Sequence, residues 1–391
     1  MILQSERIKK SDYLIATLFL ACGGNQLFTE NKWYAFIVVG IMLVMMLFQN
    51  RRLWSKELLL VEIAFFTIAL LQIAFLPLVS MPAYMNFAMK LFAGFLMVSY
   101  LGTKFRFAYF RVIVFFAVIS LFFWTFDLFF NIQFGVPVGK ACRSIGVWAY
   151  FMDEEVPRNQ GMFWEPGAYQ GYLMLVPIMF IGELKELWRK EKISCIILIA
   201  ALLSTTSTTG YVALMFIVGM YLIKGIKNTF SRVLMIIVLA ATAYYATISL
   251  DFLGNKIQEQ YLMAIDMSYE SAGTMQSRMG TMFIDFEIIK NHPVIGNGFD
   301  MDAKYGIYSD IMISSGNGLT GLICTLGIPF FLLYLIGVYK RSPAQKFFKL
   351  IAIATILLVF YGENFYNFIP YWALLFVLYD VNDIALYGKK I

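Results

Sequence analysis

Long apolar stretches are the feature of this 391-residue chain that most limits its fold. Hydrophobic residues make up 60% of the chain and charged residues only 14%, whereas soluble domains are about half apolar and about a quarter charged. A helix needs about 20 apolar residues to cross a bilayer, so we predict an all-α, multi-pass membrane protein with about twelve spans. The predicted spans are 12–29, 33–49, 57–76, 84–102, 109–131, 166–184, 193–206, 209–223, 230–250, 314–338, 347–361 and 366–386.

The distribution of basic residues predicts the orientation of these spans. Most of the 31 Lys and Arg residues fall in every second connection: 7–10, 51–56, 104–111, 185–192, 224–232, 340–349 and 389–390. Because cytoplasmic loops are enriched in Lys and Arg, both termini are predicted to be cytoplasmic. The net charge of +6 follows from this topology, so we do not predict nucleic-acid binding.

Two connections on the predicted outer side are long, 132–165 and 251–313, within a chain (1–391) that otherwise reads as one integral membrane domain. Long segments of this kind are usually functional or disordered. Apolar residues recur at helical spacing in 256–267 and 277–290, so the second segment is predicted to be partly helical. Any chemistry is therefore expected to face outward.

The first outer segment ends in the polar sequence RNQGMFWEPG, which contains Arg158, Gly161, Glu165 and Pro166. Proline suits the first turn of a helix, and the residue before a proline favours extended backbone. Glu165 is therefore predicted to lie at the mouth of a helix near the membrane surface. A carboxylate that only caps the helix and pairs with an arginine is the structural alternative.

The second outer segment contains Arg278 at the start of a predicted helix and His292, the only histidine, in the turn HPVIGNG. A lone histidine is more often structural than catalytic. Asp300 and Asp302 form a D-x-D pair, which holds a metal-bound nucleotide sugar in some transferases. Nucleotide sugars are absent outside the cell, so we predict no metal and no other cofactor.

Two further polar positions lie at predicted outer helix ends. Asn317 occurs among small residues in SSGNGLTGLICTLGIP, where the backbone of a neighbour can approach closely. Glu363 occurs among aromatic residues in YGENFYNF. Aromatic residues at this depth are typical of the membrane interface, although they also stack on sugars.

Taken in order over residues 158–330, these motifs resemble the O-antigen polymerase (Wzy) and O-antigen ligase superfamily. The resemblance is carried by R-x-x-G-x-x-x-E-P at 158–166, the small-residue run at 204–214, R…NHPVIGNGF at 278–299, and the segment 314–329. Ligases are expected to have a histidine before the asparagine of the last segment. Gly316 stands there instead, which favours the polymerase branch.

The resemblance implies a glycosyltransferase in the bacterial cytoplasmic (inner) membrane that needs no metal. It would join undecaprenyl-diphosphate-linked oligosaccharide repeat units into O-antigen, capsular polysaccharide or exopolysaccharide on the outer face. Besides these lipid-linked glycans and the bilayer, the expected partners are a chain-length regulator and a flippase. An O-antigen-type ligase, a lipid-linked oligosaccharide flippase or transporter, and a scaffold without catalysis are the alternatives. Transporters usually place their polar groups near mid-membrane, which disfavours that class here.

The implied reaction assigns roles to six residues. A departing diphosphate gains negative charge, which the fork of an arginine binds well, so Arg158 and Arg278 are predicted to bind it, with Arg143 as a third candidate. The attacking hydroxyl must lose a proton. The predicted bases are Glu165, then Glu363, then His292. A neighbouring arginine would lower the pKa of Glu165, so burial has to offset that effect. Gly161, Pro166 and Asn317 are predicted to support the site.

Overall fold

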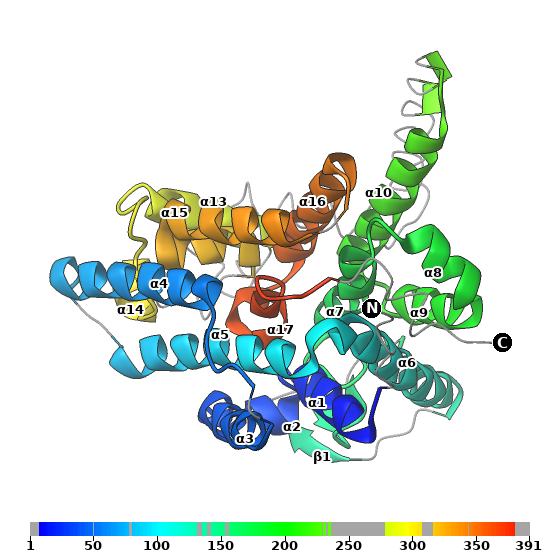
Figure 1. The fold of residues 1–391 in the computed structure, drawn as a ribbon, viewed down its shortest axis with the longest axis horizontal. Helices are drawn as coiled ribbons and strands as arrows, with labels where there is room; N and C mark the ends of the chain where they lie inside the picture. Colours follow the sequence, from blue (N-terminus) through cyan, green and yellow to red (C-terminus); the bar gives the residue numbers. More distant parts are fainter. Residues whose placement is uncertain are drawn as a thin grey trace, which may run out of the picture.

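The computed structural model describes residues 8–49, 51–77, 80–130, 135–138, 142–152, 156–228, 230–231, 234–235, 278–306, 316–342 and 344–379 (Figure 1). Helices dominate this part of the chain. The first group comprises α1 (Lys10–Ala21), α2 (Gln26–Thr29), α3 (Tyr34–Phe48), α4 (Lys56–Phe75), α5 (Met81–Leu101), η1 (Gly102–Lys104) and α6 (Phe105–Phe130). The second comprises α7 (Pro166–Met179), α8 (Leu184–Lys190), α9 (Lys192–Ser204), α10 (Thr208–Gly225), α13 (Arg278–Ile289), α14 (Met301–Tyr305), α15 (Gly318–Arg341), α16 (Lys346–Gly362), η3 (Phe365–Asn367) and α17 (Ile369–Ala373).

Four helical stretches among the described residues are long and apolar enough to cross a membrane. They are Lys56–Phe75, Met81–Phe130, Thr208–Gly225 and Gly318–Arg341. The longest stretch, Met81–Phe130, contains two of the predicted spans. Gly102, which has a φ of +58°, ends α5 between them. The outer surface of α4 exposes Leu60, Ile63 and Leu70, as expected of a helix that faces lipid. The protein is therefore a multi-pass membrane protein whose fold is mostly helical.

Several predicted spans differ from the observed helices. The prediction of one helix over 366–386 is wrong within the described residues, because α17 ends at Ala373 and residues 374–379 are not helical. The stretch 166–184 contains α7, which ends at Met179, before the separate helix α8. The predicted span 230–250 and the predicted helix 256–267 lie largely or wholly outside the described residues.

A small sheet in the first outer segment was not predicted. Strands β1 (Val136–Val138), β2 (Cys142–Ser144) and β3 (Ala149–Phe151) pair antiparallel in the order β1-β2-β3. Three-residue strands are too short to show an alternating pattern, so the sequence offers little sign of them.

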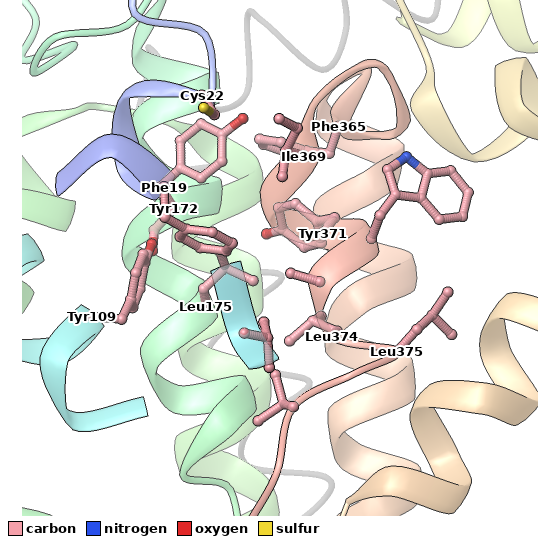
Figure 2. Packing of buried hydrophobic residues seen from close by; sticks show 14 of the residues in the cluster. Phe19, Cys22, Tyr109, Tyr172, Leu175, Phe365, Ile369, Tyr371, Leu374 and Leu375 are labelled. Carbon is pink, nitrogen blue, oxygen red and sulfur yellow. The ribbon is translucent and has the colours of Figure 1, made fainter. Parts of the chain in front are cut away.

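Buried aromatic side chains join the N-terminal and C-terminal parts of the bundle (Figure 2). The Tyr109 hydroxyl donates to the Tyr172 carbonyl at 2.7 Å, and the Tyr371 hydroxyl donates to the Gly171 carbonyl at 2.8 Å. A Cβ on Gly171 would lie 2.0 Å from the ring of Phe365, so glycine is required for this packing. These contacts fix α7 against α6 and the segment around α17.

Candidate functional site

One arginine contacts two glutamates that come from distant parts of the chain. The Arg278 Nη2 atom lies 2.5 Å from Glu363 Oε1 and 3.1 Å from Glu165 Oε1. The side chains are 19% exposed for Arg278, 9% for Glu363 and 32% for Glu165. The cluster is therefore mostly withdrawn from water, and Glu165 is its most accessible member.

Glu165 reaches this cluster because of the Glu-Pro sequence. It is the N-cap residue of α7, with extended backbone (φ −159°, ψ 162°), and Pro166 occupies the first turn. Both predicted local conformations are confirmed. Gly161 has a φ of +57°, which glycine adopts at low cost, and a Cβ there would lie 3.1 Å from the ring of Tyr169. The turn before α7 thus depends on the small residue of the motif.

Gly167, directly after the Glu-Pro pair, makes room for all three charged groups. A Cβ at this position would lie 2.7 Å from Glu165 Oε1, 2.7 Å from Glu363 Oε1 and 2.9 Å from Arg278 Nη2. The three charged side chains therefore pack closely around Gly167, and a larger residue at this position would displace them.

Glu363 follows the last residue of α16, where the start of α15 approaches it. The Asn317 side chain caps α15 by accepting hydrogen bonds from the backbone N–H groups of Leu319 and Thr320, at 3.0 Å and 3.2 Å. A Cβ on Gly318 would lie only 2.0 Å from the Glu363 carbonyl oxygen. The sequence predicted close backbone approach around Asn317, and the structure shows that the partner is Glu363.

Burial and the neighbouring charges raise the pKa values of Glu363 and Arg278 in this cluster. Burial raises the pKa of Glu363 well above its ordinary value, and the neighbouring Glu165 raises it further, while Arg278 acts in the opposite direction. Burial alone would lower the pKa of Arg278, but the two carboxylates outweigh this and raise it, so the guanidinium stays charged. Burial therefore favours the protonated form of Glu363 beside the charged Arg278.

Arg158 and Arg143 lie within 132–165, the first of the two segments predicted to be on the outer side. Arg158 is half-buried and precedes Asn159 in the turn before α7. Arg143 lies on β2, in register with Tyr150 of β3. Their predicted contact with a diphosphate stays a prediction.

His292 lies at the opposite end of α13 from Arg278. The 12 residues of α13 span about 18 Å, and His292 follows this helix whereas Arg278 begins it. Its carbonyl accepts a hydrogen bond from the Gly296 N–H at 2.8 Å. The geometry thus separates His292 from the two glutamates and gives its segment a structural role.

That role is to fasten the second outer segment to a break in α15. Gly327 interrupts α15 with φ 80° and ψ 165°. The Cys324 and Thr325 carbonyls beside the break accept hydrogen bonds from the N–H groups of Asn297 (2.7 Å) and Gly298 (3.1 Å). The Ile328 N–H in turn donates to Pro293 at 2.9 Å. The turn HPVIGNG therefore satisfies backbone groups that the broken helix leaves unpaired.

Replacing Gly327 with Ala is expected to destabilise the protein by about 3 kcal/mol, because a positive φ costs Ala about 1 kcal/mol and forced overpacking adds about 2 kcal/mol. Its Cβ would lie within 2.1 Å of the Val294 carbonyl oxygen. Thermal unfolding in detergent would measure the loss. Gly102→Ala is the matched control, since Gly102 also has a positive φ but a Cβ there meets no described atom within 4 Å. Equal losses in the two variants would show that the contact with Val294 contributes nothing.

Two buried polar groups near the site were not predicted. Asn159 donates from Nδ2 to Ser120 Oγ at 3.1 Å and to Ser204 Oγ at 2.9 Å. These hydrogen bonds connect the R-x-x-G-x-x-x-E-P motif at 158–166 to α6 and α9. Asp285 accepts hydrogen bonds from Thr320 Oγ1 at 2.6 Å and from the Tyr305 hydroxyl at 3.1 Å. Asp285 lies on the predicted helix 277–290, but helical spacing alone could not show that it faces inward.

Comparison with known families gives one match, which covers part of the chain. Residues 193–335 match the family model described as O-antigen ligase. The match contains α9, α10, α13 and most of α15, and so includes Arg278 and Asn317. It confirms the resemblance to the O-antigen ligase and polymerase superfamily, whose members transfer glycans. A search of curated proteins finds none that matches this chain.

Proposed function

We propose that the protein is the polymerase of a lipid-linked polysaccharide, acting on the outer face of the bacterial cytoplasmic membrane with both termini in the cytoplasm. Its substrates are oligosaccharide repeat units attached to undecaprenyl diphosphate. The observation that carries this proposal is the contact of Arg278 with both Glu165 and Glu363 where helices end. Transfer from a diphosphate to a hydroxyl needs a cation for the leaving group and a base for the hydroxyl proton, and this cluster contains candidates for both.

In the proposed step, a hydroxyl oxygen of one carrier-linked repeat unit attacks C1 of the sugar at the reducing end of the growing glycan. A new C1–O glycosidic bond forms, and the bond between C1 and the diphosphate oxygen breaks. Undecaprenyl diphosphate leaves with the bonding electrons, and the hydroxyl proton passes to a carboxylate. Charge therefore develops on the leaving diphosphate while one acid gains a proton.

Arg278 is placed to stabilise the leaving diphosphate. Both glutamates contact the same nitrogen, Nη2, so the Nη1 and Nε donors of the fork lie outside these two ion pairs. A guanidinium stays charged and can present a second edge to phosphate oxygens. The two glutamates thus hold Arg278 in a fixed orientation, which lowers the cost of organising it during the reaction.

Glu165 is the better candidate for the base, as the sequence predicted. Its side chain is 32% exposed, against 9% for Glu363, so an acceptor hydroxyl can reach it more easily. Burial favours the protonated form of Glu363, so Glu363 is less suited to accept a proton. Glu363 then acts by holding Arg278 through the hydrogen bond that its Oε1 atom accepts from Nη2.

The polymerase is favoured over the ligase by one position. Gly316 stands before Asn317, where the resemblance leads us to expect a histidine in ligases. A ligase would use the same donor but would transfer the finished polymer to another acceptor.

Glycan profiling of the producing cell after deletion of the gene tests this proposal. A polymerase predicts surface glycan that stops at one repeat unit. Normal-length polymer retained on the lipid carrier would instead indicate a ligase, and repeat units trapped on the inner face would indicate a flippase. An unchanged ladder would contradict all three functions.

Replacing Glu363 with Gln is expected to change the pH dependence of stability. Because folding raises the pKa of Glu363, its protonated form contributes to stability. This contribution is complete below the pKa of the unfolded chain, about 4.3, and is lost as the pH rises through the pKa of the folded protein. Gln mimics the protonated acid without titrating. The melting temperature of Glu363→Gln should therefore increase relative to that of the unsubstituted protein as the pH rises above about 5. A difference that does not vary with pH would contradict the raised pKa.

The same variant separates the roles of the two acids. Because Glu363 holds its proton, Gln keeps the neutral form of this side chain, so Glu363→Gln should retain most of the activity. Glu165→Gln should instead lower the rate about 10²-fold or more, because the proton acceptor is lost. Equal losses of rate in Glu363→Gln and Glu165→Gln would contradict this assignment.

A further inference from the structure

A pocket of about 760 Å³ lies between the start of α4, the end of α15 and the residues that follow α17. Its lining includes three cationic side chains, Arg52, Lys56 and Arg341, together with the aromatic side chains of Trp54, Phe95 and Phe376. None of these residues belongs to the cluster around Arg278. The pocket therefore needs an explanation of its own.

The helix α4 shows that this pocket is far from the second outer segment. Near the end of α4, Gln72 Nε2 donates to the carbonyls of Ile295 (2.5 Å) and Thr325 (2.8 Å). At its start, Glu57 Oε1 pairs with Arg341 Nη2 at 2.6 Å. Gln72 lies 15 positions after Glu57 in α4, a rise of about 22 Å, which is most of the thickness of a bilayer core of about 30 Å. The pocket thus faces the opposite membrane surface from the segment that carries Arg278.

The charge of the pocket favours an anionic ligand. Glu57 balances one of the three cations through its pair with Arg341. Arg52 and Lys56, both exposed, supply positive charge beyond that pair. An arginine fork and a lysine ammonium next to each other are suited to the oxygens of a phosphodiester.

The apolar walls favour a ligand that also carries hydrocarbon. The rings of Phe95 and Phe376 meet edge to face with centroids 5.5 Å apart. Trp54 is 63% exposed and Leu378 is 43% exposed beside them. Tryptophan at this depth is typical of the membrane interface, and basic pockets between membrane helices bind anionic lipid headgroups. A free phosphate ion would leave these walls in contact with water.

We propose that this pocket binds an anionic phospholipid of the leaflet opposite the candidate active site. The phosphodiester contacts Arg52 and Lys56, and the glycerol backbone and first methylene groups pack against Trp54 and Phe376. The bound lipid joins the start of α4 to the end of α15. This inference does not depend on the proposed polymerase activity.

Native mass spectrometry of the full-length protein in detergent, titrated with phosphatidylglycerol, tests the proposal. The double variant Arg52→Gln/Lys56→Gln is expected to bind about 30-fold more weakly, since each Lys or Arg near an anionic lipid contributes about 1 kcal/mol. The control Lys185→Gln/Lys340→Gln also removes two charges, from exposed positions outside the pocket, and should bind like the unsubstituted protein. Equal retention of the lipid by both double variants would overturn the proposal.

Two further ligands separate a lipid from other phosphates. Phosphatidylcholine should bind much more weakly than phosphatidylglycerol, because its headgroup has no net charge. Glycerol phosphate should fail to displace phosphatidylglycerol, because it lacks acyl chains. Displacement at equal concentration would overturn the lipid assignment in favour of a soluble phosphate.

Trp54 provides a measurement that does not require the charge variants to fold. Phosphatidylglycerol brominated near the top of its acyl chains should quench the fluorescence of the unsubstituted protein more than that of Trp54→Phe. The chain has seven tryptophans, so the difference between the two proteins isolates Trp54. Equal fractional quenching would contradict the placement of the lipid.

Discussion

Replacing Arg278 with Ala is expected to abolish long glycan chains while the protein still accumulates in the membrane. The substitution removes the cation that contacts Glu165 and Glu363 and that is proposed to stabilise the leaving diphosphate. Loss of one such electrostatic group lowers a rate about 10²- to 10³-fold. The burial of Glu363 allows it to become neutral by holding a proton, so the loss of the cation need not unfold the protein. A gel ladder of the glycan and an immunoblot of membranes would measure both effects.

Two control variants sharpen this experiment. Lys290→Ala removes a cation from the exposed end of the same segment, where Lys290 pairs with Glu287, and should leave the ladder unchanged. Arg278→Lys keeps the charge but loses the fork, so chains should be shorter without being absent. A full-length ladder from Arg278→Ala would show that Arg278 does not take part in the reaction.

The second large effect is expected from Gly167→Ala. The added methyl group would lie under 3 Å from Glu165, Glu363 and Arg278 at once. Each contact is with the flexible end of a side chain, so the fold can adjust, but the three groups cannot keep their present distances. A displacement of about 1 Å at a catalytic group can lower a rate about 10²-fold. Activity should therefore fall by about that factor with little change in melting temperature.

Gly40→Ala is the matched control for this variant. Gly40 lies inside α3, and a Cβ there meets no described atom within 4 Å. Alanine is the better helix former, so this control should keep full activity and full stability. Normal activity in Gly167→Ala would show that the observed spacing of the three charged groups is not needed for the reaction.

Part of this site could be predicted from sequence because local rules decide it. A proline sets its own φ and restricts the residue before it, so the extended backbone of Glu165 and the start of α7 follow from two letters of the sequence. The helix over 277–290 follows in the same way from apolar spacing. These rules act within a few residues.

The meeting of the three charged groups could not be predicted, because it depends on contacts across the whole chain. Arg278 is separated from Glu165 by 113 residues and from Glu363 by 85. The sequence therefore offered three arginines and three bases, ranked Glu165, Glu363 and His292, without showing which of them meet. The close approach that glycine permits at Gly167 and Gly318 becomes visible only when the neighbouring helices are in place.

The fold shows the same division. Long apolar runs predicted the helices α3, α4, α5 and α6 to within a few residues, because membrane thickness sets the length of a span. The last apolar run was misassigned, since its aromatic residues fill the bundle interior around Tyr371 and do not form one long helix. Hydrophobicity alone cannot distinguish contact with lipid from contact with protein.

The central claim, glycosyl transfer from a lipid diphosphate at Arg278 and Glu165, is tested most directly with purified protein. Lipid extracted from the deletion strain supplies the natural single-repeat substrate, whichever sugars it carries. We predict that the unsubstituted protein converts this lipid into a ladder and releases undecaprenyl diphosphate, one molecule for each bond formed, whereas Arg278→Ala does neither. The account would be contradicted if neither the purified protein nor membranes that contain it produced a ladder. Equal activity of the unsubstituted protein and Arg278→Ala would also contradict it.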